Sequence, residues 1–299
     1  MSILVVGSIA LDTVETPFGN AQDSLGGSAL YFSAAASFFA PVNLVGVVGK
    51  DFDFSKIEFL KQRGVDFEGL GVEDGETFRW GGRYHKNMNQ RDTLFTYLNV
   101  FKNFQPVIPD HYRDARLIFL ANIDPELQLD VLHQVKGPEL TVLDTMNFWI
   151  SGKREALEEL ITKVDVLILN DEELYELTNI PNMYDSAHEL LQQGPRALVI
   201  KKGEHGAVLV TVDQYFLAPA FPLRKVVDPT GAGDSFAGGF LGYLATCKTI
   251  DAKHFRKAVI YGTVTASFTV EDFSFNRLRE ISRKEIEERV ETLRNMVVF

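Results

Sequence analysis

Residues 226–240 read Val226-Val227-Asp228-Pro229-Thr230-Gly231-Ala232-Gly233-Asp234-Ser235-Phe236-Ala237-Gly238-Gly239-Phe240. A strand-like lead-in meets a glycine-rich turn, and the helix that follows has Phe236 and Phe240 on one face. Gly231 and Gly233 allow backbone N–H groups to converge at the positive end of the helix dipole. The pattern therefore predicts a binding site for an anion such as a phosphate group.

Asp234 lies at the mouth of this turn. A carboxylate beside a helix N-terminus is expected to be a weak base, because the dipole favours its charged form. A weak base suffices for phosphoryl transfer, in which the attacking hydroxyl loses its proton late. The plain alternative is that Asp234 only caps the helix. Gly238 and Gly239 weaken a helix, so their presence indicates close backbone packing.

Outward from this turn, short apolar runs alternate with amphipathic segments. This alternation predicts an α/β fold with a mostly parallel central sheet flanked by helices and with ligands at the carboxyl ends of the strands. The expected strands are Ile3–Val6, Val42–Val48, Leu117–Leu120, Leu140–Leu143, Val164–Leu169 and Ala197–Ile200. The expected helices are Ala29–Phe39, Ser55–Arg63, Pro125–Gln134, Lys153–Lys163, Asp171–Leu177, Ser186–Gln192, Asp234–Cys247, Lys253–Val270 and Arg283–Met296.

Two segments break the alternation, residues 11–20 and 69–105. The second is rich in aromatic residues and threonine and partly alternates, as exposed antiparallel strands do. We expect both segments to form a small β-sheet lid that projects from a core of residues 1–10, 21–68 and 106–299. An apolar face on this lid predicts a homodimer, and the lid itself could close over a ligand.

The amino-acid composition limits the classes of partner and the cellular compartment that we expect. The 299 residues carry a formal charge of −11, which disfavours nucleic acid and anionic membrane surfaces as partners. The single cysteine, Cys247, excludes an internal disulfide and fits a reducing compartment. The N-terminus has no basic region before its short apolar run, so no signal peptide is indicated. These features predict a cytoplasmic protein.

Asp228 to Asp234, with the residues up to Phe240, resembles the C-terminal signature of the ribokinase-like (PfkB) carbohydrate kinases. Gly26-Gly27-Ser28-Ala29 and the run from Val45 to Asp51 resemble the family's N-terminal motifs. The resemblance implies transfer of the γ-phosphoryl group of ATP, with Mg²⁺, to a hydroxyl of a small sugar or sugar-like molecule. It implies that Asp234 is the catalytic base and that Gly231, Ala232 and Gly233 form the anion hole. It also implies that Asp12, Gly26 and Gly27 bind the acceptor.

The same resemblance assigns a nucleotide side, where each residue also has a simpler interpretation. Asn170 and Glu173 resemble a motif that positions magnesium and phosphates, with Glu173 acting through water, yet their spacing is also that of a capping box. Lys202 and Gly203 resemble the loop beside ATP, although a plain hairpin has the same pattern. Thr230 and Ser267 are also expected on this side, although Ser267 lies among residues that could equally belong to the core.

Three points stay open at this stage. Asn89 and Arg91, in the lid, are expected to contact the acceptor, although polar strand residues often face solvent. Tyr31 stands where ribokinases carry an asparagine, which raises a nucleoside as an alternative acceptor if the ring stacks on a base, or marks Tyr31 as a core residue. The third open point is the function itself, because a non-catalytic sensor of sugars or nucleotides on this fold is an alternative to a kinase. The chain lacks both the Gly-x-Gly-x-x-Gly fingerprint after its first strand and a P-loop.

Overall fold

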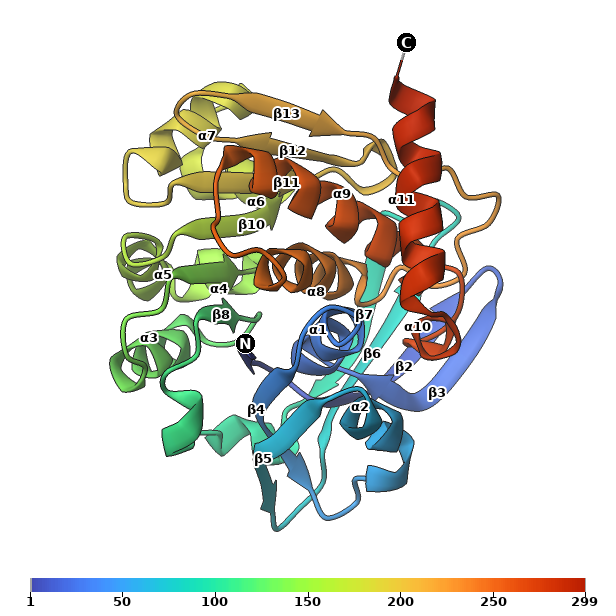
Figure 1. Cartoon of the computed structure of the whole chain (residues 1–299). Coiled ribbons are helices and arrows are strands. Elements are labelled where there is room, and N and C mark those ends of the chain that lie inside the picture. Colours follow the sequence, from blue (N-terminus) through green and yellow to red (C-terminus); the bar gives the residue numbers. More distant parts are fainter. Residues whose placement is uncertain (1, 299) are drawn as a thin grey trace.

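The computed structural model describes residues 2–298 and has a nine-stranded central sheet (Figure 1). Its strand order is β13-β12-β11-β10-β9-β8-β1-β4-β5, parallel from β11 to β5, with β12 and β13 antiparallel at one edge. The strands are β1 Ile3–Val6, β4 Val42–Gly49, β5 Val65–Glu73, β8 Leu117–Leu120, β9 Leu140–Asp144, β10 Val166–Asn170, β11 Ala197–Lys201, β12 Ala207–Val210 and β13 Tyr215–Ala218. The predicted α/β fold with a mostly parallel sheet is confirmed.

Helices cover both faces of this sheet and enclose two apolar cores. One face carries α1 Ser28–Ala36, α2 Glu58–Gln62, α8 Ala232–Ala245, α9 Ala252–Thr269, α10 Asn276–Glu280 and α11 Arg283–Val297. The other carries α3 Pro125–Gln134, α4 Asn147–Gly152, α5 Arg154–Ile161, α6 Asp171–Thr178 and α7 Met183–Leu191. Because both faces are covered, the central strands are apolar on both sides, which is why they read as continuous hydrophobic runs.

The glycines of α8 serve close packing, as the sequence indicated. A Cβ at Gly238 would lie 2.5 Å from the Phe32 carbonyl oxygen on α1, and one at Gly239 would lie 2.3 Å from Thr265 Oγ1 on α9. The backbone of α8 is therefore pressed between its two neighbours. This contact fixes the middle of α8, whose N-terminal end carries the predicted site.

A separate four-stranded sheet has the order β3-β2-β6-β7 and is lid-like (Figure 1). Its strands are β2 Ala10–Thr16, β3 Gly19–Gly26, β6 Phe78–Tyr84 and β7 Arg91–Tyr97. The structure draws its limits differently from the sequence. Residues 21–26, expected in the core, belong to β3, because β3 pairs with β2 from Gly19 to Gly26. Residues 69–73, expected in the lid, pair with β4 as part of the main sheet.

Asp51 anchors the start of β6 to the main sheet. Its Oδ1 accepts hydrogen bonds of 2.7 Å from both the backbone N–H and the hydroxyl of Thr77, and its Oδ2 accepts from Arg79 at 2.8 Å. Thr77 Oγ1 in turn accepts from the Gly49 N–H at the end of β4. The carboxyl end of the main sheet and the base of the lid are therefore tied together.

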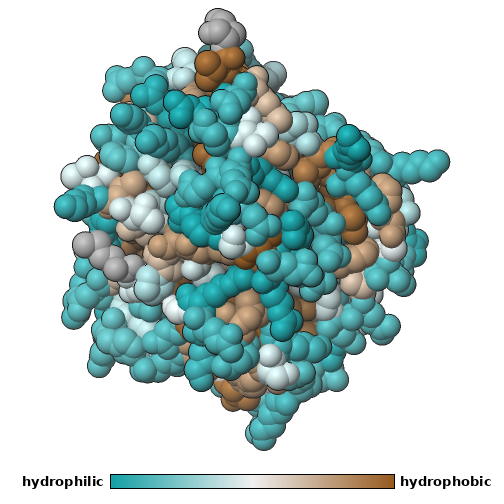
Figure 2. Space-filling model, turned by 45° about the vertical axis from the view of Figure 1, so that its right-hand side comes forward, coloured by the Kyte–Doolittle hydropathy of each residue, from teal (hydrophilic) through white to brown (hydrophobic). Residues whose placement is uncertain are grey.

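Two apolar side chains on β7 are exposed. Tyr97 is 57% exposed and Leu94 is 42% exposed. On the face drawn in Figure 2, hydrophilic residues cover most of the surface and hydrophobic ones appear in scattered groups. The expectation that two chains pair through the lid stays a prediction.

The stacked rings of Phe32 and Phe119 offer a test of the core beneath α1. Their centroids are 4.4 Å apart, and both side chains are fully buried. Phe119→Ala should lower the free energy of unfolding by about 3–5 kcal/mol, because it leaves a cavity between α1 and β8. Urea unfolding measures the change. The matched control is Phe148→Ala at a side chain that is 64% exposed, which should stay within about 0.5 kcal/mol of the parent. Equal stability of the two variants would contradict this account of the core.

Candidate active site

The turn that leads into α8 is held from two sides. Asp228 Oδ1 accepts a 2.9 Å hydrogen bond from the Thr230 N–H, and Oδ2 accepts a 3.4 Å bond from the Ser274 N–H. Gly231 has a φ of 72°, and a Cβ there would lie 2.3 Å from the Tyr31 ring. Only glycine combines this left-handed conformation with so close an approach to an aromatic face.

Backbone N–H groups at this turn remain available to a ligand. Ala232 N–H donates to the Pro229 carbonyl, but among residues 2–298 no acceptor is bonded to the N–H of Gly231 or Gly233. Both groups lie at the start of α8, where the helix dipole is positive. The predicted anion-binding turn, Gly231-Ala232-Gly233, therefore has the donors that a phosphate group requires.

Asp234 lies in the first turn of α8 and is partly buried. Burial and the nearby Asp144 carboxylate raise its pKa to about 7, although the Lys201 ammonium and the N–H of Asp234 itself act in the opposite direction. This reverses the expectation of a weak base, because loss of hydration outweighs the dipole of the helix. A carboxyl group that titrates near neutral pH is suited to general base catalysis.

Asp12, on β2, faces the same region. A Cβ at Gly26 would lie 1.9 Å from Asp12 Oδ2, so the carboxylate rests against the bare backbone of the glycine pair. Burial and the carboxylates of Asp228 and Asp234 raise the pKa of Asp12 to about 8, while Arg91 and the Gly27 N–H lower it. The effect of Asp234 on the pKa of Asp12 indicates that these two residues, from opposite ends of the chain, lie near each other.

Lid residues reach this site in different ways. Tyr84 Oη accepts a 3.2 Å hydrogen bond from the Thr230 hydroxyl, which joins the lid to the anion-binding turn. Arg91 is exposed, its guanidinium carbon lies 5.0 Å from the Trp80 ring centroid, and its charge acts on Asp12. The Oδ1 of Asn89 is 2.8 Å from the position of a Cβ at Gly203, in the loop expected beside the nucleotide, and its expected contact with the acceptor stays a prediction.

Asn170 and Glu173 form a capping box at the start of α6. Asn170 Oδ1 accepts from the Glu173 N–H at 2.8 Å, and Glu173 Oε2 accepts from the Asn170 N–H at 2.7 Å. Burial raises the pKa of Glu173 to about 7, against the lowering effect of Lys201. Within residues 2–298, no group of three or more His, Cys, Asp or Glu side chains is arranged to hold a metal ion. The excess of carboxylates over cations here fits a magnesium ion held through waters and phosphate oxygens.

The other expected nucleotide contacts are placed as follows. Lys202 Nζ pairs with Asp171 Oδ2 at 2.8 Å on the surface, and Gly203 begins the exposed 3-10 turn Gly203–His205 between β11 and β12. Ser267, on α9, is buried, and its hydroxyl donates to the Val264 carbonyl and accepts from Arg289 on α11. That hydroxyl is thus already used within the protein.

The arrangement combines a glycine turn with unbonded N–H groups, the Asp234 carboxyl group with a pKa near 7 and the buried carboxyl group of Asp12. Residues 3–279 match the family described as pfkB family carbohydrate kinase. The chain belongs to this family. It is therefore a kinase of the PfkB family, whose members act on sugars or nucleosides. Over residues 2–298, no helix is long and apolar enough to span a membrane.

Individual PfkB relatives resemble the chain over most of its length. A cytidine kinase of Thermococcus kodakarensis is 32% identical over 249 residues, covering 81% of this chain and 88% of that one. The crystal structure of a Methanocaldococcus jannaschii nucleoside kinase has a TM-score of 0.78 at 26% identity, covering 97% and 98% of the two chains. A putative ribokinase II of E. coli in complex with ATP and Mg²⁺ has a TM-score of 0.80 at 19% identity, covering 97% and 99%.

The structure answers one point that the sequence left open and brings two further residues to the site. Tyr31 is 1% exposed and packs against Gly231 and Phe275, so it belongs to the core and supports the turn instead of stacking on a nucleobase. Lys201 and Asp144 form a 2.9 Å ion pair beside Asp234. They are 57 residues apart, and the only sequence signal was that each ends an apolar strand.

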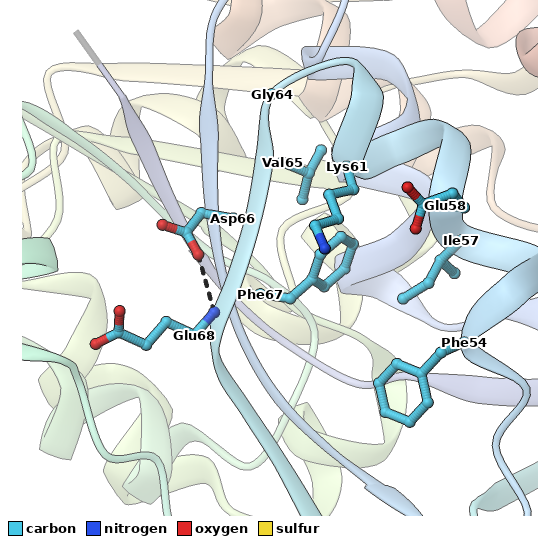
Figure 3. A pocket seen from close by; sticks show the side chains of 9 residues that line it. All are labelled: Phe54, Ile57, Glu58, Lys61, Gly64, Val65, Asp66, Phe67 and Glu68. Carbon is cyan, nitrogen blue, oxygen red and sulfur yellow. Dashed lines mark hydrogen bonds between the residues drawn. The ribbon is translucent and has the colours of Figure 1, made fainter.

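A hollow of ≈ 590 Å³ lies away from this PfkB site, between α2 and the edge strand β5 (Figure 3). Its lining residues are Phe54, Ile57, Glu58, Lys61, Gly64, Val65, Asp66, Phe67 and Glu68. None of the predicted site residues is among them. The hollow therefore takes no part in the assignment of the active site.

Gly231 provides a test of the turn. Gly231→Ala should lower the free energy of unfolding by about 1–3 kcal/mol or more. Alanine is strained at a φ of 72°, and its methyl group would meet the Tyr31 ring. Thermal melting followed by circular dichroism measures the loss. Gly152→Ala is the matched control, since a Cβ at Gly152 has no atom within 4 Å. A Gly231→Ala protein as stable as the control would show that the turn is not held in this way.

Proposed function

We propose that this PfkB kinase transfers the γ-phosphoryl group of ATP to a hydroxyl group on the sugar of a nucleoside. The observation that carries the proposal is the convergence of Asp12 and Asp234 on one site beside the unbonded N–H groups of Gly231 and Gly233. In this proposal Asp12 holds acceptor hydroxyls and Asp234 takes a proton. The N–H groups of Gly231 and Gly233 receive the migrating phosphoryl group.

In the reaction, the acceptor hydroxyl gives its proton to Asp234 and its oxygen attacks the γ-phosphorus. The bond from that phosphorus to the β–γ bridging oxygen breaks, and ADP leaves. The N–H groups of Gly231 and Gly233 stabilise the charge on the phosphoryl oxygens in transit. Bound Mg²⁺ would supply charge neutralisation on the phosphates. Asn170 and Glu173, whose capping box uses one side-chain oxygen of each, would hold its waters.

The choice of a nucleoside over a free sugar rests on the relatives. The cytidine kinase and the nucleoside kinase are 32% and 29% identical to this chain over 81% and 90% of its length. A free pentose is the second candidate, because ribokinase and deoxyribokinase relatives are 27% and 33% identical over 80% and 62% of the chain. Both acceptors offer the same kind of hydroxyl to Asp12 and Asp234.

A panel assay distinguishes these acceptors. ADP release with Mg-ATP is measured for cytidine, other nucleosides, ribose, deoxyribose and hexoses at equal concentrations. We expect the highest kcat/KM for a nucleoside. A higher value for a free sugar would replace the nucleoside by the second candidate. Binding of nucleotide and acceptor by calorimetry without ADP release would favour a sensor and refute the proposed reaction.

Asp234→Asn tests the catalytic base. The variant should keep its melting temperature and lose roughly 10²–10⁴-fold in kcat, because asparagine has the size of aspartate but cannot accept the proton. Assays of the ADP formed at fixed times measure the loss in kcat. Asp213→Asn, at an exposed position in the turn between β12 and β13, is the control and should retain parental kcat. Parental turnover by Asp234→Asn would exclude Asp234 as the base.

A further inference from the structure

The side chain of Lys201 lies across the carboxyl ends of neighbouring strands, next to the active site. The neighbouring strands β9, β10 and β11 end at Asp144, Asn170 and Lys201, and Asn170 pairs with Lys201 in the register of β10 and β11. The Lys201 side chain passes across the end of β10, and its Nζ lies 2.9 Å from Asp144 Oδ1. The Asp144 side chain is 8% exposed and that of Lys201 is 20% exposed, so the pair is largely removed from water.

The ammonium group also lies against the anion-binding turn. Lys201 Nζ is 3.1 Å from the position that a Cβ would take at Gly233. The N–H of Gly233 is one of the two at this turn that have no acceptor among residues 2–298. A fixed positive charge and unbonded N–H donors thus border the same small space. An anion in that space would meet both.

Lys201 has more negative charge around it than a structural ion pair requires. Asp144, Glu173 and Asp234 all raise its pKa, and together they overcome the lowering effect of burial, so the side chain stays protonated. One carboxylate would satisfy a purely structural lysine, and a buried pair often adds little stability compared with apolar residues. The adjacent Lys202 shows the ordinary arrangement, a single surface ion pair with Asp171.

We propose that Lys201 is a catalytic residue that binds the phosphoryl group in transit, and that Asp144 is the residue that positions its ammonium. The inference rests on the proposed phosphoryl transfer and adds a donor that the anion-hole glycines alone do not supply. A phosphoryl oxygen at the turn would share the ammonium with Asp144. Lys201 forms no covalent bond and gives up no proton, so the balance of the reaction given above is unchanged.

The first experiment separates the phosphoryl group from the rest of the nucleotide. Calorimetry compares Mg-ADP with a non-hydrolysable Mg-ATP analogue on the parent and on Lys201→Met. Loss of a charged hydrogen bond should weaken the analogue at least about 10-fold while the ADP affinity changes less than about 3-fold. Equal effects on both nucleotides would overturn the proposal, and this readout needs no turnover.

The second experiment measures turnover. Lys201→Met should lower kcat by roughly 10²–10³-fold, the usual loss for one donor that stabilises charge in the transition state. Lys201→Arg, which keeps the charge, should recover part of that loss. The control is Lys163→Met, which removes a lysine from a surface pair with Glu159 and should leave kcat unchanged. Parental kcat in Lys201→Met would overturn the proposal.

The acidic limb of the pH profile tests whether the charges of Lys201 and Asp144 act on the proposed base. Asp234 faces Asp144 and Lys201, and Asp12 and Tyr31 lie within electrostatic reach. Lys201 lowers the pKa of Asp234 and Asp144 raises it. Because the base must be deprotonated, Lys201→Met should move the limb to higher pH. Asp144→Asn should move it to lower pH. Shifts in one common direction would contradict the arrangement.

A double variant without charges in this pair distinguishes a loss of catalysis from a loss of folding. Lys201→Gln with Asp144→Asn keeps a polar pair of similar size and leaves no unpaired charge, so its melting temperature should stay close to that of the parent. Its kcat should still fall at least about 10²-fold. A folded double variant with parental kcat would make the pair merely structural. If the parent itself turned over no acceptor, the proposed function would fail first and this assignment would fail with it.

Discussion

The contact between the Gly231 backbone and the face of the Tyr31 ring is the constraint on which the site depends. It lets the start of α8 come within reach of α1, whose first residues follow the glycine pair Gly26-Gly27 beside Asp12. Asp228 holds the same turn through Thr230 and Ser274. One aromatic ring and one residue without a side chain therefore join the glycine pair beside Asp12 to the turn before α8, although these segments are more than 200 residues apart in sequence.

The site concentrates acidic groups that gain little from folding alone. Burial raises the pKa of Asp12, Glu173 and Asp234 well above those of ordinary carboxyl groups, so each loses hydration without gaining a full counter-charge. Such arrangements persist where a ligand supplies the missing charge. Magnesium and the donors around the phosphates are the natural complement in a kinase of this family. The rigid packing of α8 between α1 and α9 supplies the stability that the acidic groups do not.

Much of this architecture could be predicted from the sequence, for identifiable reasons. Buried parallel strands are continuous apolar runs, so β1 and β8 were predicted residue for residue, and α3 was delimited by its N-terminal Pro125. The strand β3 was not recognised, because its sequence Gly-Asn-Ala-Gln-Asp-Ser-Leu-Gly lacks the usual strand residues and is stabilised by pairing with β2. In the site, the glycine turn could be predicted because it is a continuous sequence motif. The Lys201–Asp144 pair could not be predicted, because the two residues come together only through the order of the strands in the sheet.

One hairpin of the lid, formed by β6 and β7, contacts both the turn before α8 and the loop after β11. Tyr84, at the end of β6, accepts a hydrogen bond from Thr230 of the anion-binding turn, and Asn89, just beyond it, lies against Gly203 of the loop on the other side. A movement that lifts this hairpin breaks both contacts together. The two contacts are therefore mechanically coupled, so a displacement at one end of the hairpin is transmitted to the other.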